Sequence, residues 1–291
     1  MGNIDIYLDS IHEAYPDLKV EKVRAHPHDG QFNDILIINE ELIFRFPRFE
    51  ENIPDFVSQV RLLQYIQGSI SLLIPNPIYS STKSTTTNKI FMGYRMVPGE
   101  HLTRGKLAAI RDDTILQRLA DQLARFLSEL HSIPVTDLEN GLPVQDGPEA
   151  WAELYTEIQQ HLFHFMRSGA KARVRDHFEA YLNNPGLHRY RICLRHGDFG
   201  PGNILYNPED QTISGVIDFD GMGLGDPAID IAAASCYGEA FTRRFRPAYP
   251  EVDSMMERTR FYKGTFALQE ALHGFKNKDN EAFQSGMAEY V

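Results

Sequence analysis

Cysteine is scarce in this chain. Cys193 and Cys236 are the only two among 291 residues, and both stand beside apolar residues. So few thiols exclude a disulfide framework and are typical of reduced core cysteines. The chain also lacks an apolar run approaching the roughly 18 to 20 residues that span a bilayer. Its first residues contain no basic region followed by an apolar stretch, so we expect no secretory signal and a cytoplasmic protein that binds no membrane.

Basic residues are too few to balance the acidic ones. Lysine and arginine total 29 against 40 aspartates and glutamates, which gives a net charge of −11. This argues against nucleic acid as a partner, because phosphate backbones are bound by clustered lysine and arginine. Residues 191–234 contain 2 basic and 7 acidic side chains, a local charge of −5. Such crowding of carboxylates favours a segment that holds a divalent cation.

The hydrophobic pattern changes near residue 98. Before it, the sequence predicts helices at 4–18 and 53–67 and about five strands, with β-like runs at 20–25, 34–39, 41–46 and 89–97. After it, the sequence predicts helices at 112–131, 148–166, 171–182, 228–236 and 260–275, and strand-like runs at 192–194, 204–206 and 213–217. These elements indicate an α+β fold: a small sheet-bearing lobe, residues 1–97, and a larger, mainly helical lobe, residues 98–291.

One stretch of sequence carries most of the chemistry. Residues 194–203 read LRHGDFGPGN and residues 215–220 read GVIDFD, so Asp198, Asn203 and Asp218 fall on loops at the ends of strand-like runs. Phosphoryl transfer uses such a set: one carboxylate orients the attacking hydroxyl, and two oxygen ligands hold Mg²⁺ against a nucleotide. Each residue alone also suits a turn or a helix cap. The three together predict a kinase, with Asp198 catalytic and Asn203 and Asp218 as metal ligands.

The same motif, continued by Gly225-Asp226-Pro227 and Asp230, resembles the aminoglycoside and macrolide phosphotransferases, which are kinase-like enzymes that phosphorylate antibiotic hydroxyls. The resemblance covers most of the chain. It implies a protein-kinase-like bilobal fold, with an antiparallel sheet in a nucleotide-binding N-terminal lobe. The catalytic loop, metal loop and acceptor site then belong to the C-terminal lobe. It also implies Mg²⁺, GTP or ATP as phosphoryl donor, a bracing role for His196 in the catalytic loop, and structural roles for Asp226 and Asp230 around the metal loop.

The nucleotide side departs from the kinase pattern, in which a lysine on the third strand pairs with a glutamate on the following helix. Here Arg45 stands on the strand and Gln59 on the helix, unless Glu50 or Glu51 supplies the carboxylate. Arg45 can bind phosphate, and a solvated edge-strand arginine is the alternative. The glycine-rich loop is reduced to Gly30, which we expect at the phosphates, although an ordinary turn also explains it.

Residues 92–99, which read MGYRMVPG, stand where a kinase hinge belongs. We expect backbone groups near Arg95 and Val97 to contact the base. Tyr94 resembles a bulky gatekeeper, and in related antibiotic kinases such bulk is associated with GTP use. The resemblance therefore predicts that GTP is accepted at least as well as ATP.

The acceptor is the least determined partner. Residues 235–291 carry 8 basic and 8 acidic side chains and are neutral overall, whereas a polycationic aminoglycoside favours a site lined with carboxylates. The segment also contains aromatic side chains of which we expect most in the core, among them Tyr237, Phe241, Phe245, Tyr249, Phe261, Tyr262, Phe266 and Phe275. The balance favours a less charged acceptor, such as a macrolide or another amino sugar, unless the acidic residues cluster.

Two alternatives stay open. The motif is shared with choline, homoserine and fructosamine kinases, so the acceptor could be a metabolic small molecule. Arg45, Gln59 and the thin glycine loop suit a non-catalytic nucleotide-binding scaffold, although the complete set of Asp198, Asn203 and Asp218 argues against it. We expect a monomer whose partners are a nucleoside triphosphate and a small hydroxyl-bearing acceptor.

Overall fold

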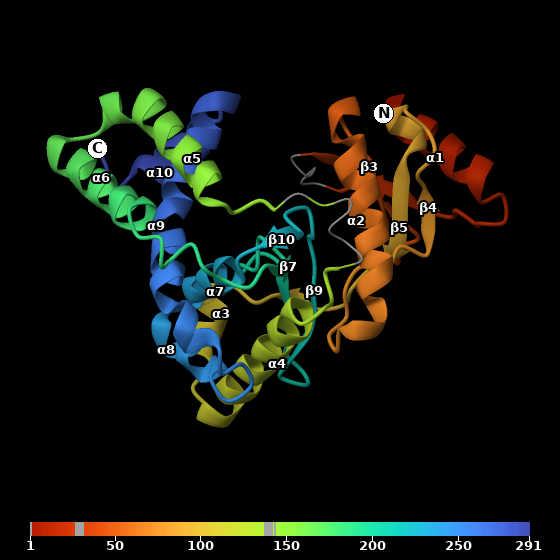
Figure 1. The fold of residues 1–291 in the computed structure, drawn as a ribbon. Coiled ribbons are helices and arrows are strands. Elements are labelled where there is room, and N and C mark those ends of the chain that lie inside the picture. The colour runs from red at the N-terminus through yellow and green to blue at the C-terminus, as the bar shows by residue number, and fades with distance from the viewer. Residues whose placement is uncertain (1, 27–31, 137–141, 143) are drawn as a thin grey trace. The chain divides into compact units, whose positions relative to one another are not determined.

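A computed structural model describes residues 2–26, 32–136, 142 and 144–291 (Figure 1). Its internal contacts divide the chain into two compact units. The sheet unit comprises Met1–Leu102 and Asn203–Asp220, and the helical unit comprises Thr103–Gly202 and Gly221–Val291. The lobe boundary between residues 97 and 98 stays a prediction.

The sheet unit is built on a five-stranded antiparallel sheet in the order β1-β2-β3-β5-β4. Its strands are β1 (Val23–Ala25), β2 (Asn33–Ile38), β3 (Leu42–Pro47), β4 (Tyr79–Ser81) and β5 (Phe91–Arg95). The β2–β3 turn places Asn39 and Glu40 at φ of 53° and 58°, the left-handed pair that suits a tight hairpin. The predicted sheet is confirmed, but β4 lies at the edge of a polar stretch that gave no strand signal.

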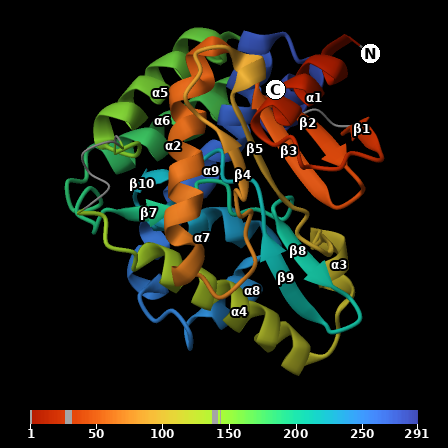
Figure 2. The ribbon, with the colours of Figure 1, turned by 90° about the vertical axis from the view of Figure 1, so that its right-hand side faces the viewer.

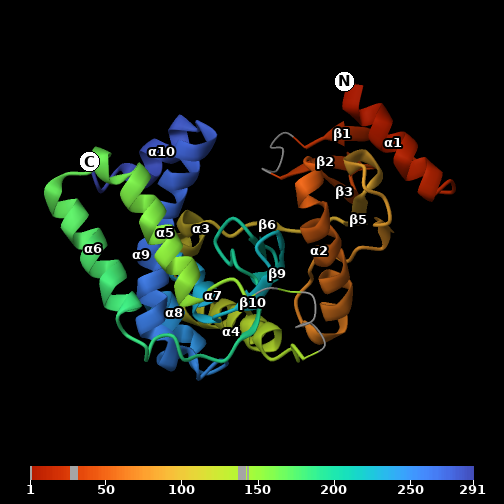
Figure 3. The same cartoon turned by 45° about the horizontal axis from the view of Figure 1, so that its top comes forward.

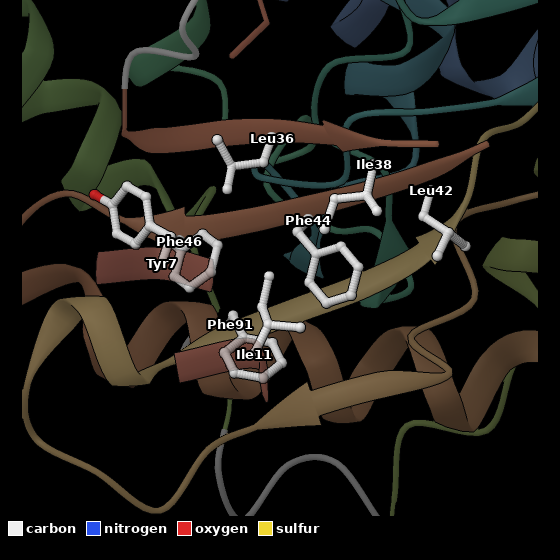
Figure 4. Packing of buried hydrophobic residues seen from close by; sticks show 8 residues of the cluster. All are labelled: Tyr7, Ile11, Leu36, Ile38, Leu42, Phe44, Phe46 and Phe91. Atoms are coloured by element: carbon white, nitrogen blue, oxygen red, sulfur yellow. The ribbon is translucent and has the colours of Figure 1, made fainter. Parts of the chain in front are cut away.

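Helix α1 (Gly2–Ala14) covers one face of this sheet and ends two residues before Pro16, which cannot continue a helix. Its residues Tyr7 and Ile11 pack against buried side chains of the sheet (Figure 4), namely Leu36, Ile38, Leu42, Phe44, Phe46 and Phe91. Side chains alternate along a strand, so Arg45 points to the face opposite Phe44 and Phe46. Helix α2 (Ile53–Ile66), with Pro54 in its first turn, supplies Gln59 to the same cluster as Arg45.

A second, three-stranded sheet completes the sheet unit in the order β6-β8-β9. Its strands are β6 (Glu100–His101), β8 (Ile204–Asn207) and β9 (Thr212–Val216), and β8 and β9 form a hairpin (Figure 2). Gly215 is required on β9, because a Cβ there would lie 2.5 Å from both the Leu73 carbonyl oxygen and a Val97 methyl. The two strand-like runs predicted around the metal motif are therefore confirmed.

The helical unit contains eight α-helices within the described residues: α3 (Arg104–Ala109), α4 (Asp113–His131), α5 (Pro148–His161), α6 (Ser168–Leu182), α7 (Ala228–Ala234), α8 (Glu239–Thr242), α9 (Val252–Asn277) and α10 (Asn280–Met287). Helices α5, α6 and α9 pack side by side (Figure 3), with Tyr181 stacked 3.7 Å from Phe261 and Tyr155 stacked 4.8 Å from Phe178. Asp112 caps α4 by accepting from Thr114 and Ile115 N–H groups. Five of the aromatic residues named above from the C-terminal segment are buried: Phe241, Phe245, Tyr249, Phe261 and Tyr262.

Two short strands, β7 (Cys193–Arg195) and β10 (Gly223–Gly225), pair antiparallel in the helical unit, and the second was not predicted. The remaining regular elements are single 3₁₀ turns at Glu50–Asn52, Gln67–Ser69, Thr87–Lys89, Phe163–Phe165, Ser235–Tyr237 and Arg243–Phe245. Both cysteines are free thiols. Across the described ranges, the structure contains no helix with the length and apolar composition needed to cross a membrane.

Candidate active site

Asp198 lies in the helical unit on the loop that follows β7. Its backbone N–H donates to His196 Nδ1 at 3.2 Å, and its carbonyl accepts from Gly200 N–H at 2.9 Å. The next residue, Phe199, is buried and stacks on Phe126 of α4 with ring centroids 5.4 Å apart. The loop is thus held in place before and after Asp198, and Asp198 itself is exposed. His196 is fully buried and binds the loop backbone, which fits its predicted bracing role.

Asp230, in the first turn of α7, anchors the start of this loop. Its two oxygens accept the backbone N–H groups of His196 and Gly197, each at 2.8 Å. Oδ2 also contacts His131 Nε2 at 2.9 Å, and His131 Nδ1 lies 2.8 Å from the Tyr249 hydroxyl. Gly197 has φ of 85°, and a Cβ there would overlap the Gly221 carbonyl, so the loop requires glycine. Burial opposes ionisation of Asp230, but its hydrogen bond with His131 and its electrostatic interactions with His131, His196 and Arg195 together outweigh burial and lower its pKa.

Asp226 organises the helix behind the loop. It is fully buried, caps α7 through the Ala228 N–H at 2.9 Å, and accepts from Arg258 Nε at 2.6 Å and the Tyr262 hydroxyl at 2.8 Å. The partners Arg258 and Tyr262 come from α9, so Asp226 fixes α7 to α9. Among the described contacts, Asp230 binds the backbone of the loop that contains Asp198. Asp226 instead binds α7 and α9.

A second buried ion pair, between Arg195 and Asp146, supports the end of β7. Arg195 Nε and Nη2 donate to the two Asp146 oxygens at 2.5 and 2.9 Å, and Nη1 donates to the Gly221 carbonyl at 3.0 Å. This bidentate pair joins the catalytic loop to a residue 49 positions earlier in the chain. No local pattern in the sequence indicates this pair, because its two residues lie 49 positions apart.

Asn203 and Asp218 lie together in the sheet unit, at the ends of β8 and β9. The backbone N–H of Ile217 donates to the Asn203 carbonyl at 2.9 Å, which places the two loops in register. Asp218 adopts φ of 60°, a left-handed conformation that is uncommon outside glycine and that concentrates at functional sites. Both side chains offer oxygen donors, and Mg²⁺ typically takes one or two protein ligands and completes its shell with water and phosphate. The two residues therefore fit a magnesium site.

Arg45 is on the central strand β3 and is 5% exposed, so the interpretation as a solvated edge-strand arginine is wrong. Its Nη2 contacts Asp220 Oδ1 and Oδ2 at 2.7 and 2.6 Å and lies 3.7 Å from Asp218 Oδ1. Burial alone would lower the pKa of Arg45, but the charges of Asp220 and Asp218 raise it above its usual value. Gln59 Nε2 also donates to Asp220 Oδ1, at 2.6 Å.

Asp220 is thus a residue that the sequence did not single out. The carboxylate missing from α2 is supplied by Asp220 and not by Glu50 or Glu51, which are exposed in the 3₁₀ turn before that helix. The sequence placed Asp220 two residues after Asp218 but gave no reason to connect it with Arg45, which lies 175 residues earlier.

The proposed hinge residues follow one another at the end of β5. Tyr94 is buried and pairs with Ile43 of β3, two residues from Arg45, and burial raises the pKa of its phenol. Arg95 pairs with Leu42, and its exposed guanidinium lies 3.8 Å from Glu41. Val97 is 9% exposed. Gly30, expected at the phosphates, lies outside the described residues.

The site residues accordingly form two groups, one in each unit. His196 and Asp198 share the catalytic loop of the helical unit. Asn203, Asp218 and Arg45 belong to the sheet unit, where the loops of Asn203 and Asp218 are hydrogen-bonded and the Arg45 guanidinium lies near the Asp218 carboxylate. A carboxylate predicted to activate the acceptor, and residues predicted to bind metal and phosphate, are the parts that phosphoryl transfer requires.

Comparison with known proteins agrees with this chemistry. Residues 23–262 match a family described as the phosphotransferase enzyme family. The chain is 27% identical over 268 residues to the viomycin phosphotransferase of Streptomyces vinaceus, with 90% of this chain and 91% of that protein aligned. The similarity to that relative therefore extends over nearly the whole length of both proteins.

Solved structures confirm the predicted fold. The GDP and kanamycin complex of APH(2″)-IIIa superposes with a TM-score of 0.87 at 27% identity, covering 97% of this chain and 96% of that one. The macrolide 2′-phosphotransferase MphH from Brachybacterium faecium superposes with a TM-score of 0.72 at 18% identity, covering 97% of each chain, and shares the fold. The chain has the α+β, protein-kinase-like fold of antibiotic phosphotransferases.

Proposed function

The chain belongs to the phosphotransferase enzyme family as a small-molecule O-phosphotransferase, and from this premise we propose that it transfers the γ-phosphate of GTP or ATP to a hydroxyl of an antibiotic. The acceptor oxygen forms a bond to the γ-phosphorus while the bond from that phosphorus to the β–γ bridging oxygen breaks. The nucleoside diphosphate leaves, and the hydroxyl proton passes to Asp198.

Asp198 is the proposed catalytic residue. Its carboxylate accepts a hydrogen bond from the acceptor hydroxyl and orients the oxygen toward the phosphorus. The tether through His196 Nδ1 fixes the backbone from which this carboxylate projects. His196 acts on the reaction through Asp198 and does not need to touch the substrate.

Asn203 and Asp218 are the proposed Mg²⁺ ligands. When bound, Mg²⁺ supplies positive charge that offsets the phosphate oxygens in the transition state. The observation that carries the proposal is the 2.9 Å bond from Ile217 N–H to the Asn203 carbonyl, because it holds both ligand loops together beside the Arg45 guanidinium. A turn or cap role for these residues would not require that convergence.

Arg45, Gly30 and the hinge residues Tyr94, Arg95 and Val97 are the proposed nucleotide contacts. Arg45 binds phosphate oxygens, and the backbone of Arg95 and Val97 binds the base. The buried Tyr94 restricts the space behind the base, which supports GTP as a donor at least as good as ATP. Turnover with GTP and ATP at equal concentration tests this, and a rate with GTP far below that with ATP contradicts it.

The acceptor is proposed as a class, a hydroxyl-bearing antibiotic. Two carboxylates of the neutral C-terminal segment are already paired, Glu239 with Arg243 at 3.1 Å and Asp253 with Arg246 at 2.7 Å. They line a cavity of about 280 Å³ in the helical unit together with Arg260. Paired carboxylates attract a polycation less than free ones, which supports an acceptor of modest charge.

A panel of acceptors distinguishes the remaining possibilities. Nucleoside diphosphate release is measured with viomycin, kanamycin, a macrolide, choline and homoserine. Turnover with an antibiotic supports the proposal, and turnover restricted to choline or homoserine favours a metabolic kinase. Nucleotide binding without turnover on any acceptor favours a scaffold.

Asp198→Ala tests the mechanism. General-base catalysis contributes roughly 100- to 10,000-fold, so turnover should fall by that order while nucleotide binding persists. Asp176→Ala, a change of an exposed aspartate on α6, is the matched control and should retain activity. Full activity in Asp198→Ala would remove this carboxylate from the mechanism.

A further inference from the structure

In this chain, the carboxylate that kinases place on the helix after the third strand comes from another element. Gln59 occupies the helix position and is neutral, yet Arg45 beside it is 5% exposed and needs a counter-charge. That charge comes from Asp220, on the loop that follows Asp218. The position of the carboxylate, and not its presence, differs from the kinase pattern.

Asp220 collects donors from three elements. Its Oδ1 accepts from Arg45 of β3 and from Gln59 of α2, each bond 2.6 to 2.7 Å long. Its Oδ2 accepts from Arg45 at 2.6 Å and from Asn33 Nδ2 of β2 at 3.0 Å. Asn33 and Gln59 are 4% and 7% exposed, so packing restricts the positions of both donors.

We propose that Asp220 is a positioning residue for the nucleotide, which holds the Arg45 guanidinium at the phosphate site and keeps the Asp218 carboxylate available for metal. This inference rests on the proposed function. Gln59 then acts as a neutral support for Asp220, so the strand cation and the helix remain linked although the helix carries no charge.

The two distances explain why Asp220 and Asp218 take different roles. Arg45 Nη2 lies 2.6 Å from Asp220 and 3.7 Å from Asp218, so Asp220 is the closer ion-pair partner. Without the Asp220 charge, Asp218 would be the remaining carboxylate near a buried cation and would be drawn toward it. A carboxylate in an ion pair is a poorer metal ligand, because the guanidinium and the metal compete for the same oxygens.

Arg45 also retains a donor for a ligand. Its Nη2 makes both bonds to Asp220, while its buried Nε has no hydrogen-bond partner among the residues that the structure describes. A buried donor without a partner is unfavourable, and a phosphate oxygen would satisfy it. Asp220, Gln59 and Asn33, which surround the Arg45 ion pair, also line a cavity of about 170 Å³.

The test moves the carboxylate between the two positions. Asp220→Asn removes the charge with almost no change of shape, and the double change Asp220→Asn with Gln59→Glu returns one carboxylate on α2. Asp9→Asn is the matched control, because Asp9 is an exposed aspartate of the same unit on α1, which covers the sheet face opposite Arg45. The readouts are the dissociation constant for Mg²⁺-free GDP, the nucleotide KM against kcat, and the Mg²⁺ concentration that gives half-maximal turnover.

Asp220→Asn should weaken GDP binding roughly 10- to 100-fold, the loss expected when one partner of a buried charge pair is removed. The nucleotide KM should rise more than kcat falls, and more Mg²⁺ should be needed. The double variant should recover GDP affinity to within a few-fold of the original chain, and Asp9→Asn should leave it unchanged.

Equal GDP affinity in the original chain and in Asp220→Asn would overturn the inference, as would tighter binding by the variant, which would mean that Asp220 withholds Arg45 from phosphate. If Asp220→Asn does not fold, the double variant carries the test: restored binding supports the inference, and a folded double variant that does not bind GDP overturns it. Failure of the unmodified chain to bind any nucleotide would instead refute the proposed function.

Discussion

Asp230 and Asp220 are two carboxylates that each gather several donors, one in each unit of the molecule. Asp230 is fully buried and binds two backbone N–H groups and His131. The Asp220 side chain is 29% exposed and binds side chains only. Backbone donors fix the shape of a loop, whereas side-chain donors fix the position of a charge. The first carboxylate therefore belongs to the folding of the loop proposed as catalytic, and the second to the electrostatics of the proposed nucleotide site.

Asp230→Asn should produce the largest loss of stability. An asparagine cannot accept from both loop N–H groups and His131 with two equivalent oxygens, and breaking a buried ionic hydrogen-bond set costs about 3 to 5 kcal/mol. Urea denaturation at neutral pH measures the loss in the free energy of unfolding. A loss below about 1 kcal/mol would show that the loop keeps its shape without the Asp230 charge.

The stability that Asp230 contributes should depend on pH, because its pKa is lowered from the ordinary 3.8. A depressed carboxyl pKa means that the unfolded chain takes up this proton first as pH falls. The contribution is therefore complete above pH 3.8 and is lost as pH falls through the lower folded-state value.

The measurement compares the free energy of unfolding of the original chain and of Asp230→Asn from pH 6 to pH 3. The difference should be constant down to about pH 4 and shrink below it. A difference that stays constant to pH 3 would contradict a lowered pKa for Asp230.

The contrast between the two carboxylates also separates what sequence predicts from what it does not. Asp198, Asn203 and Asp218 were placed on loops because the strands beside them, β7, β8 and β9, are short apolar runs with a local signal. The metal and catalytic motifs are local in the same way, so their loops could be predicted. Residues 193–195, 204–207 and 212–216 confirm those strands.

Long-range pairs could not be predicted from the same patterns. Arg45 and Asp220 are 175 positions apart, and Asp146 and Arg195 are 49 apart, so no periodicity reports either contact. A single arginine in a strand is predicted to be exposed, because arginine is seldom buried without a charged partner. The sequence does not show which distant residue is that partner. The long helix α9 was also predicted too short, since its first turns are rich in polar residues.

Asp220→Asn should destabilise the chain less than Asp230→Asn. The single amide oxygen keeps two of the four bonds in weakened form, part of the carboxylate faces solvent, and Asp218 lies near enough to Arg45 to compensate in part. We expect a loss of about 1 to 2 kcal/mol, reduced for solvent screening. The urea measurement used for Asp230 checks this, and Asp9→Asn is again the control. A loss as large as that of Asp230→Asn would mean that both carboxylates serve folding alike.

The smallest effect should come from an exposed pair in the sheet unit, which tests whether burial or charge alone sets the two larger effects. Arg24 Nη2 lies 2.9 Å from Glu40 Oε2, the same distance as between His131 Nε2 and Asp230 Oδ2, yet both side chains are about half exposed, at 46% and 54%. Screening by water and salt leaves such pairs with little net stability. Arg24→Gln should therefore shift the melting temperature by at most about 2 °C, and added salt should remove the shift. A shift comparable with that of Asp220→Asn would show that ion pairing by itself, without buried donors from several elements, explains the stability of both clusters.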